Sequence, residues 1–202
     1  MAVECFKRKG ESLDDWLLYV KFKEGDPSAF HELFKKHKAR VINLSYHFVR
    51  RQEVAEDIAQ DVFIKVYEKK INVDVKAKFT TWLYRVTVNA SMDHLRSKGS
   101  HLVSLDEKLD GQDSDETRLE RTADPKSLSP LQILGSDELR GLVRKEVDAL
   151  PGNLKSCLLL YQFEEMPYQE IAKILGITPK AVERRLYHAK SILKRNLAKY
   201  LS

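Results

Sequence analysis

The sequence predicts an all-α protein, built from two helical domains that are joined by a flexible acidic linker. Three observations predict this fold class. Apolar residues recur every three or four positions along most of the chain, as on the buried side of an amphipathic helix. Glycine and proline stand between the periodic segments, where helices end and begin. The periodicity is interrupted at length only once, so we expect domains at residues 1–98 and 131–202 and a linker at 99–130.

The composition is that of a globular protein of 202 residues, with 43% hydrophobic and 32% charged residues. This length allows one large domain or two small ones, each with its own core. The formal net charge of +5 favours an anionic partner but does not identify one. Cys5 and Cys157 lie far apart without metal-ligand spacing, and no apolar run could cross a membrane. Because the start has no apolar signal sequence, we expect a reduced cytoplasmic protein.

The first domain is expected to begin with three helices. The first starts near Ser12 and ends at Gly25, and the second starts at Pro27 behind the capping residue Asp26. The third runs over about 52–70, with a continuous apolar edge and an acidic side opposite. An acidic helix side is usually only a solvated surface, and nothing in this segment alone indicates more.

The fourth helix is expected at 78–96, KFTTWLYRVTVNASMDHLR, which carries the most distinctive pattern of the chain. A strand is arguable because aromatic and apolar residues alternate, but the segment is long for a strand and has no hairpin partner. At helical spacing, aromatic, basic and amide side chains form one stripe that suits unstacked nucleic acid. The pattern is equally compatible with a packed helix that has ordinary surface charge. The stripe consists of Trp82, Arg85, Asn89, Asp93 and Arg96.

Residues 99–130 contain eight acidic and four basic residues and few large apolar side chains. Such a segment buries too little apolar surface to offset the entropy lost on ordering, so we expect a linker.

The second domain is expected to hold four more helices, over about 136–150 and 153–163 and then on both sides of Gly176. Thr178 can cap the last helix, which Pro179 opens. From Thr178 to the end there are seven basic residues and a single acid, Glu183. A short helix, a glycine turn and a long basic helix form the helix-turn-helix plan, whose second helix fits the major groove. The alternative is a basic helical hairpin that binds no nucleic acid.

Taken together, these segments resemble bacterial RNA polymerase sigma factors of the extracytoplasmic-function (ECF) type, within the sigma-70 family. The first domain resembles the sigma-2 module over 25–98, through GDPSAFHELFKKH, AEDIAQDVFIKVYE and FTTWLYRVTVNASMDHLR. The second resembles the sigma-4 module over about 136–197, through LPGNLKSCLLLYQFEEMPYQEIAKILGITPKAVERRLYHAKSIL. The resemblance covers both expected domains in the family's order.

The resemblance implies a promoter-specificity subunit of RNA polymerase, without catalytic residues, cofactor or metal. In such factors sigma-2 binds the clamp helices of the largest polymerase subunit and captures bases of the melted minus-10 strand. Sigma-4 reads the minus-35 duplex and contacts the polymerase flap. The family is often held inactive by an anti-sigma factor, so the resemblance also implies such a partner.

Carried onto this chain, the resemblance assigns three sets of residues. The acidic side of the third helix becomes the polymerase contact, through Asp57, Gln60 and Asp61. The minus-10 set is Lys76, Lys78, Trp82, Arg85, Asn89 and Arg96. The minus-35 set is Tyr168, Lys180, Arg184, Arg185, Tyr187 and His188. Arg184, His188 and Glu183 depart from the residues common in the family, so the resemblance predicts a mode of binding and no promoter sequence.

Two other function classes have less support in the sequence. A helix-turn-helix regulator that binds operator DNA on its own would need its two half-site readers at a fixed spacing, which the linker opposes. An enzyme or metal protein lacks a phosphate-binding glycine loop, a nucleophile with its base, and clustered histidines.

Overall fold

The computed structural model describes residues 12–68, 78–97 and 137–201, and every regular element within these ranges is an α-helix. The predicted all-α fold class is confirmed. Lys76 and the expected linker at 99–130 lie outside the described residues. The helices are α1 (Ser12–Lys23), α2 (Pro27–Val49), α3 (Gln52–Tyr67), α4 (Phe79–Ser97), α5 (Asp137–Asp148), α6 (Gly152–Phe163), α7 (Tyr168–Leu175) and α8 (Pro179–Leu201).

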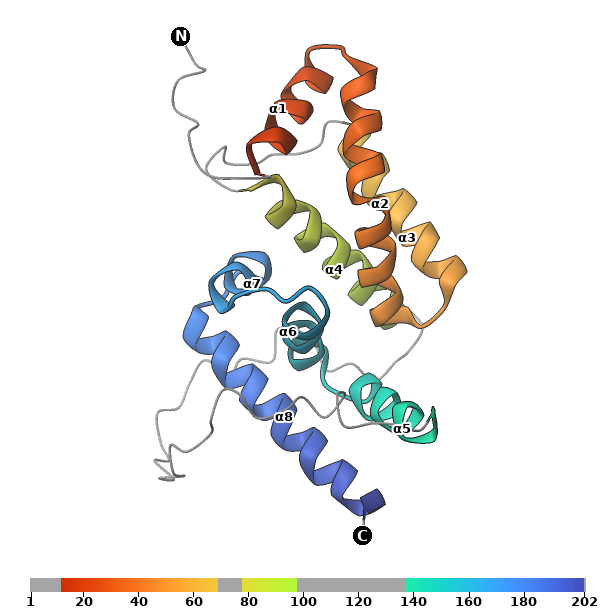
Figure 1. Ribbon diagram of the computed structural model, residues 1–202, viewed down its shortest axis with the longest axis vertical. Helices are drawn as coiled ribbons and strands as arrows, with labels where there is room; N and C mark the ends of the chain where they lie inside the picture. The colour runs from red at the N-terminus through yellow and green to blue at the C-terminus, as the bar shows by residue number, and fades with distance from the viewer. Residues whose placement is uncertain (1–11, 69–77, 98–136, 202) are drawn as a thin grey trace.

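Helices α1 to α4 pack around one apolar core in the upper part of Figure 1. The Asp26 side chain caps α2 by accepting a hydrogen bond from the Ser28 backbone N–H at 2.9 Å, as predicted. His37 is 2% exposed, and its Nε2 lies 3.1 Å from the buried Asp15 carboxylate. This histidine is therefore a packed core residue that ties α1 to α2. The largest fully buried side chains of this core are Leu33, Phe79 and Leu83.

Helices α5 to α8 form the second half and contain the predicted helix-turn-helix, α7 followed by α8. Gly176 ends α7 in the left-handed conformation, with φ 69°, and its N–H is donated to the Ala172 carbonyl. Thr178 Oγ1 accepts a hydrogen bond from the Ala181 N–H at 3.2 Å, so it caps α8 as predicted. The core of this half includes the fully buried Leu159, Leu160, Ile171 and Leu186.

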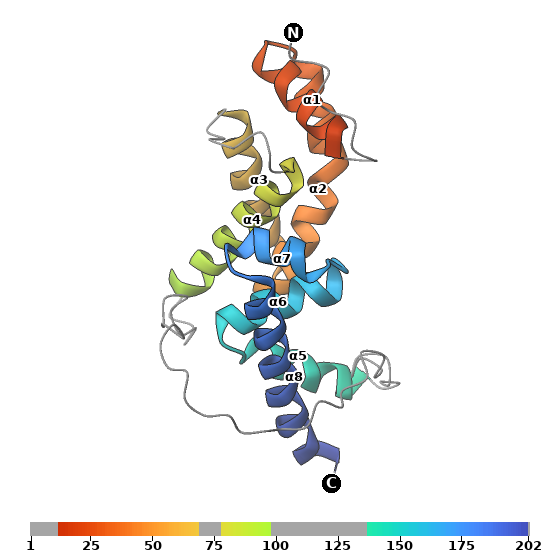
Figure 2. The same ribbon diagram turned by 90° about the vertical axis from the view of Figure 1, so that its left-hand side faces the viewer.

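The two halves pack directly against each other, and the sequence did not predict this contact. Phe48 of α2 and Met92 of α4 are each 1% exposed and belong to the same apolar cluster as the core of the second half. Gly152 allows the close approach, because a Cβ at this position would lie 2.2 Å from the Met92 Cε. The two views in Figure 1 and Figure 2 show α4 alongside α6 and α7 at this junction.

A buried lysine strengthens the junction. The Lys155 side chain of α6 is 2% exposed and donates hydrogen bonds to the Phe48 carbonyl at 3.1 Å and to Asp148 Oδ1 at 2.9 Å. Arg50, which follows α2 with φ 57°, pairs with the same Asp148 carboxylate at 3.2 Å. Burial lowers the pKa of the Lys155 ammonium, and the hydrogen bond to Asp148 opposes that shift. The last turn of α2 is thus bound to α5 and α6.

Candidate nucleic-acid interface

The stripe predicted on α4 is only partly open to solvent. Arg85, Asn89, Asp93 and Arg96 are exposed, and Arg96 pairs with Asp93 at 3.1 Å. Trp82 is half-buried, because its ring packs near Phe79 with 6.2 Å between the ring centroids. The predicted stripe is therefore exposed at its polar positions and half-covered at its aromatic one.

Two basic residues of the predicted minus-10 set contact α7. Arg85 Nε donates a hydrogen bond to the Ile174 carbonyl at 3.0 Å, and its Nη2 donates to the Lys173 carbonyl. Lys78 Nζ lies 3.2 Å from Glu170 Oε1. Both cations are exposed, as the sequence placed them, and the neighbouring half of the protein also supplies oxygen acceptors to each of them.

The outward side of α8 carries most of the predicted minus-35 set. Lys180, Arg184, Tyr187 and His188 are exposed, while Val182, Leu186, Ala189 and Leu193 are buried on the other side. In Figure 1, α8 runs along the edge of the molecule to the C-terminus. A long basic helix with this exposure can enter a DNA groove without rearrangement of its own half.

The remaining two minus-35 candidates are less open. Arg185 is half-buried beside the Cys157 thiol, and Tyr168 is half-buried against Tyr161, with 5.7 Å between ring centroids. Burial raises the pKa of the Cys157 thiol to about 11, against the opposing effect of Arg185. Cys157 is fully buried and acts as a small core residue.

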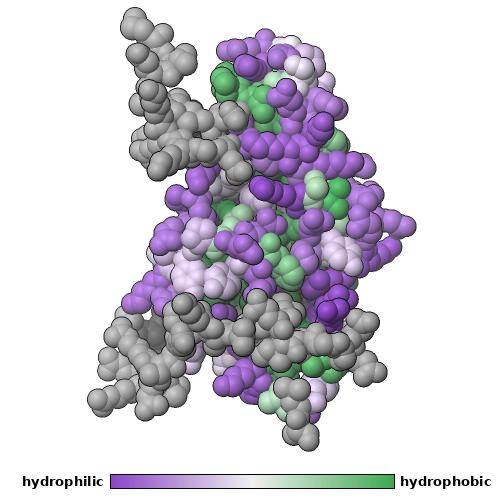
Figure 3. Space-filling view, viewed as in Figure 1, coloured by the Kyte–Doolittle hydropathy of each residue, from purple (hydrophilic) through white to green (hydrophobic). Residues whose placement is uncertain are grey.

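The acidic side of α3 presents Asp57, Gln60 and Asp61 to solvent. Ile64 is 52% exposed on the same side, one turn further along, and sequence reasoning missed it. The helical period could have indicated that Ile64 is exposed, because residues 57, 61 and 64 share one helix side. A single exposed apolar side chain is common on protein surfaces, so Ile64 adds apolar area to this acidic side and does not by itself identify a partner. In the view of Figure 3, by contrast, hydrophilic side chains cover most of the visible described surface.

A polar pocket of about 510 Å³ opens at the junction of the two halves. Tyr84 donates a hydrogen bond from its hydroxyl to Glu164 Oε2 at 2.7 Å, and burial raises the pKa of both groups. The imidazole of His47 stacks on the Phe163 ring at 3.7 Å. Burial lowers the His47 pKa to about 4, assisted by the positive charge of Arg50 and Arg144.

The His47 shift predicts an acid-sensitive junction. The unfolded chain takes up a proton on this imidazole near pH 6.5, whereas the folded chain does so near pH 4. The free energy of unfolding should therefore fall as the pH is lowered through this window. We expect this pH-dependent decrease in the free energy of unfolding to be about 1–2 kcal/mol smaller in His47→Gln than in the wild-type protein. The figure allows for the partial exposure of the imidazole.

Urea unfolding of both proteins at several pH values measures the effect. The raised pKa of Glu164 acts in the opposite direction and is common to both proteins, so the difference between them isolates His47. If the free energy of unfolding depended on pH in the same way in both proteins, His47 would not be the source of the acid sensitivity.

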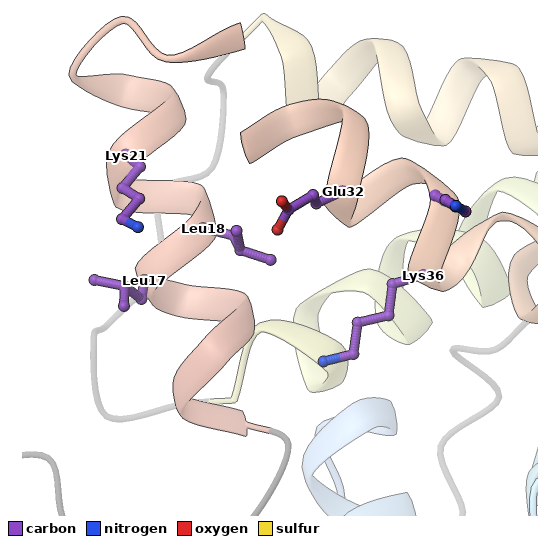
Figure 4. Close-up of a pocket in the computed structure, with 6 residues that line it drawn as sticks. Leu17, Leu18, Lys21, Glu32 and Lys36 are labelled. Atoms are coloured by element: carbon purple, nitrogen blue, oxygen red, sulfur yellow. The ribbon is translucent and has the colours of Figure 1, made fainter. Parts of the chain in front are cut away.

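A second pocket, also of about 510 Å³, lies between α1 and α2 and contains none of the predicted site residues. Leu18 of α1 and Glu32 of α2 extend toward each other across it in Figure 4. Lys21 and Lys36 stand at its sides, and Lys36 is already paired with Asp15 at 2.7 Å.

Within the described ranges, no cluster of three or more His, Cys, Asp or Glu side chains could hold a metal ion. No described helix combines the length and apolar character that a membrane span requires.

Two family models match the chain. The model of sigma-70 region 2 matches residues 33–101, and that of sigma-70 region 4 matches residues 140–193. Together the two segments make up more than half of the chain, in the order that the sequence analysis expected.

Curated relatives match the chain over nearly its whole length. The RNA polymerase sigma-H factor of Pseudomonas aeruginosa is 29% identical over 184 residues, which cover 91% of this chain and 93% of the relative. The ECF RNA polymerase sigma factor SigW of Bacillus subtilis is 29% identical over 175 residues, which cover 87% of this chain and 92% of the relative. The ECF RNA polymerase sigma-E factor of Escherichia coli K12 is 29% identical over 184 residues, which cover 91% of this chain and 94% of the relative.

Solved structures share the fold at lower identity. CnrH in complex with the cytosolic domain of CnrY is 20% identical with a TM-score of 0.64, covering 92% of this chain and 98% of CnrH. The sigma factor RpoE in complex with the anti-sigma factor NepR, from Bartonella quintana, is 20% identical with a TM-score of 0.56. The match covers 84% of this chain and 96% of RpoE. The helical architecture, the two family models and these relatives agree: the chain belongs to the sigma-70 family of bacterial RNA polymerase sigma factors and is of the extracytoplasmic-function type.

Proposed function

We propose that this sigma factor directs core RNA polymerase to promoters through three surfaces and promotes open-complex formation. In this proposal residues 1–98 bind the polymerase clamp helices and the minus-10 strand, and residues 131–202 bind the minus-35 duplex and the flap. The observation that carries the proposal is the open basic side of α8, held behind the tight turn at Gly176. Family membership supports the same role.

The minus-35 surface is the side of α8 with Lys180, Arg184, Tyr187 and His188. Arg184 is suited to bidentate contact with a guanine edge, and Lys180 to a phosphate. Arg185 and Tyr168 are half-buried, so we assign them supporting contacts at the edge of the DNA.

The minus-10 surface consists of Lys78, which directly precedes α4, and four residues of the α4 stripe, Trp82, Arg85, Asn89 and Arg96. The half-buried Trp82 offers part of its ring for stacking on an unpaired base, which contributes about 1–3 kcal/mol per base in such sites. Asn89 can hydrogen-bond a base edge, while the three cations suit the phosphate backbone.

We also propose an anti-sigma factor as a partner. Two structural neighbours were solved in complexes, CnrH with the cytosolic domain of CnrY and RpoE with the anti-sigma factor NepR. Their fold is shared by this chain, which supports a comparable partner here.

Reconstitution with core polymerase tests the proposed function. Core enzyme supplied with this chain should start transcripts at defined positions on a library of genomic fragments, whereas core enzyme alone should not. Equal initiation with and without the chain would refute the proposal. Tight operator binding by the chain without polymerase would favour an independent regulator.

Base reading by α8 gives a further prediction. Arg184→Ala should cost about 1–3 kcal/mol at a subset of upstream sequences and little at others, if the guanidinium contacts base edges. Lys194→Ala is the matched control, because Lys194 is also exposed on α8 and should act only through phosphate. Holoenzyme binding to a panel of upstream sequences measures both. A uniform loss for Arg184→Ala would assign it to phosphate contact alone.

A further inference from the structure

One acidic side chain lies within the basic outward side of α8. From Thr178 to the end of the chain there are seven basic residues and a single acid, Glu183. Glu183 is exposed, and it lies one turn after Lys180 and one turn before Tyr187. Residues three or four positions apart share one side of a helix, so the carboxylate lies within the proposed minus-35 surface. The residues assigned to that surface did not include it.

Glu183 occupies the part of α8 that is best placed to reach base edges. It is the fifth residue of α8, and in a helix-turn-helix the N-terminal residues of the second helix contact bases while the first helix crosses the backbone. Its charge also acts on the first residue of α7. Burial raises the pKa of Tyr168, and Tyr161 and the negative charge of Glu183 add to that rise. The carboxylate therefore lies near the N-terminal ends of both helices of the motif.

An ionised carboxylate at such a position distinguishes bases by their hydrogen-bonding groups. It can only accept hydrogen bonds, so phosphate oxygens and the acceptor edges of guanine and thymine repel it. In the major groove cytosine presents its N4 amino group as a donor, whereas adenine presents its N6 amino group beside the N7 acceptor. Cytosine is therefore the base that suits a carboxylate best.

We propose that Glu183 is a specificity-determining residue, which accepts a hydrogen bond from the N4 amino group of a cytosine in the minus-35 duplex and disfavours guanine and thymine at that position. The inference rests on the proposed role of α8 in binding duplex DNA. The adjacent Arg184 is suited to guanine, so both side chains favour G·C base pairs at the start of α8. At sequences without the cytosine, the carboxylate weakens binding because it faces acceptors and phosphates.

Selection of duplex DNA by binding tests the base preference directly. Holoenzyme, and separately the free full-length chain at low salt, select from duplexes that are randomised over the upstream region, and the bound duplexes are sequenced. We expect the wild-type chain to favour cytosine over guanine and thymine by about tenfold at one position. Glu183→Ala should remove this preference and bind the other sequences more tightly.

Glu183→Gln gives a chemically distinct result. A glutamine amide donates to N7 and accepts from N6 of adenine at the same time, so the preferred base should change from cytosine to adenine at the same position. Loss of folding would remove preferences and could not create a new one. An unchanged preferred base in this variant, together with an unchanged preference in Glu183→Ala, would overturn the inference.

Glu24→Ala is the control for net charge. Glu24 is exposed directly after α1, so its removal changes the charge by the same amount outside the proposed DNA surfaces. The base frequencies that this variant selects should match those of the wild-type chain. If Glu183→Ala strengthens binding to all sequences by the same factor, Glu183 acts only through its charge and the inference is overturned.

The transcription assay keeps this result separate from the proposed function. If holoenzyme initiates at defined promoters, but wild-type and Glu183→Ala chains select the same base frequencies, the proposed function stands and the role of Glu183 is overturned. If holoenzyme initiates at no promoter, but the free chain selects cytosine in a way that depends on Glu183, the role of Glu183 stands and the proposed function fails.

Discussion

Phe48→Ala is expected to lower the free energy of unfolding by about 3–5 kcal/mol, the usual cost of deleting a fully buried phenyl ring. The side chain is 1% exposed and belongs to the apolar cluster that joins α2 and α4 to the second half. Its removal leaves a cavity at the junction, so both halves should lose stability together. Urea unfolding followed by far-ultraviolet circular dichroism measures the total change.

Phe79→Ala is the matched control for this prediction. Phe79 is 0% exposed but lies in the core of α1 to α4, where it contacts Trp16 and Trp82. We expect a similar total cost, with a transition in tryptophan fluorescence that precedes the loss of helicity, because both tryptophans lie in the first half. In Phe48→Ala, by contrast, the transition in tryptophan fluorescence and the loss of helicity should occur at the same urea concentration. A cost below about 1 kcal/mol for Phe48→Ala would contradict a tightly packed junction.

Charge reversal on α3 should have the largest effect on function. The double variant Asp57→Lys with Asp61→Lys is expected to weaken binding to core polymerase by about 100-fold or more, because like charges that face each other in an interface cost several kcal/mol. Both residues are exposed, so the fold should tolerate the change. Titration of a fluorescently labelled chain with core enzyme measures the affinity.

Glu24→Lys with Glu32→Lys provides the control for charge. Both glutamates are exposed away from α3, and the change in net charge is identical. An equal loss of affinity in both double variants would show that overall charge, and not the α3 surface, determines the binding to polymerase.

The helices could be predicted from the sequence because their causes are local. Asp26 caps α2 and Gly176 ends α7 through contacts with residues a few positions away, and the apolar period identifies each buried side. For the same reason the acidic side of α3 and the basic character of α8 could be stated in advance. Resemblance to a family then supplied roles that periodicity alone does not give.

The junction could not be predicted, because it joins residues that are far apart in the sequence. Arg85 binds a carbonyl 89 positions away, and Lys155 binds one 107 positions away. Helical periodicity shows which side of α4 is polar, but not that α7 covers part of that side. The partial burial of Trp82 has a different, local cause, since its large ring lies at the edge of the polar stripe and reaches back to Phe79, three positions earlier.

The hydrogen bond from Lys155 to the Phe48 carbonyl bears on attempts to study the two halves as separate fragments. An isolated fragment that ends between residues 98 and 136 keeps α2 but lacks the Lys155 ammonium group that satisfies the final turn of α2. The last turn of α2 would then unwind, and the exposed Phe48 side chain would favour aggregation. Limited proteolysis should therefore yield fragments that remain associated until denatured, and isolated halves would be poor substitutes for the intact chain.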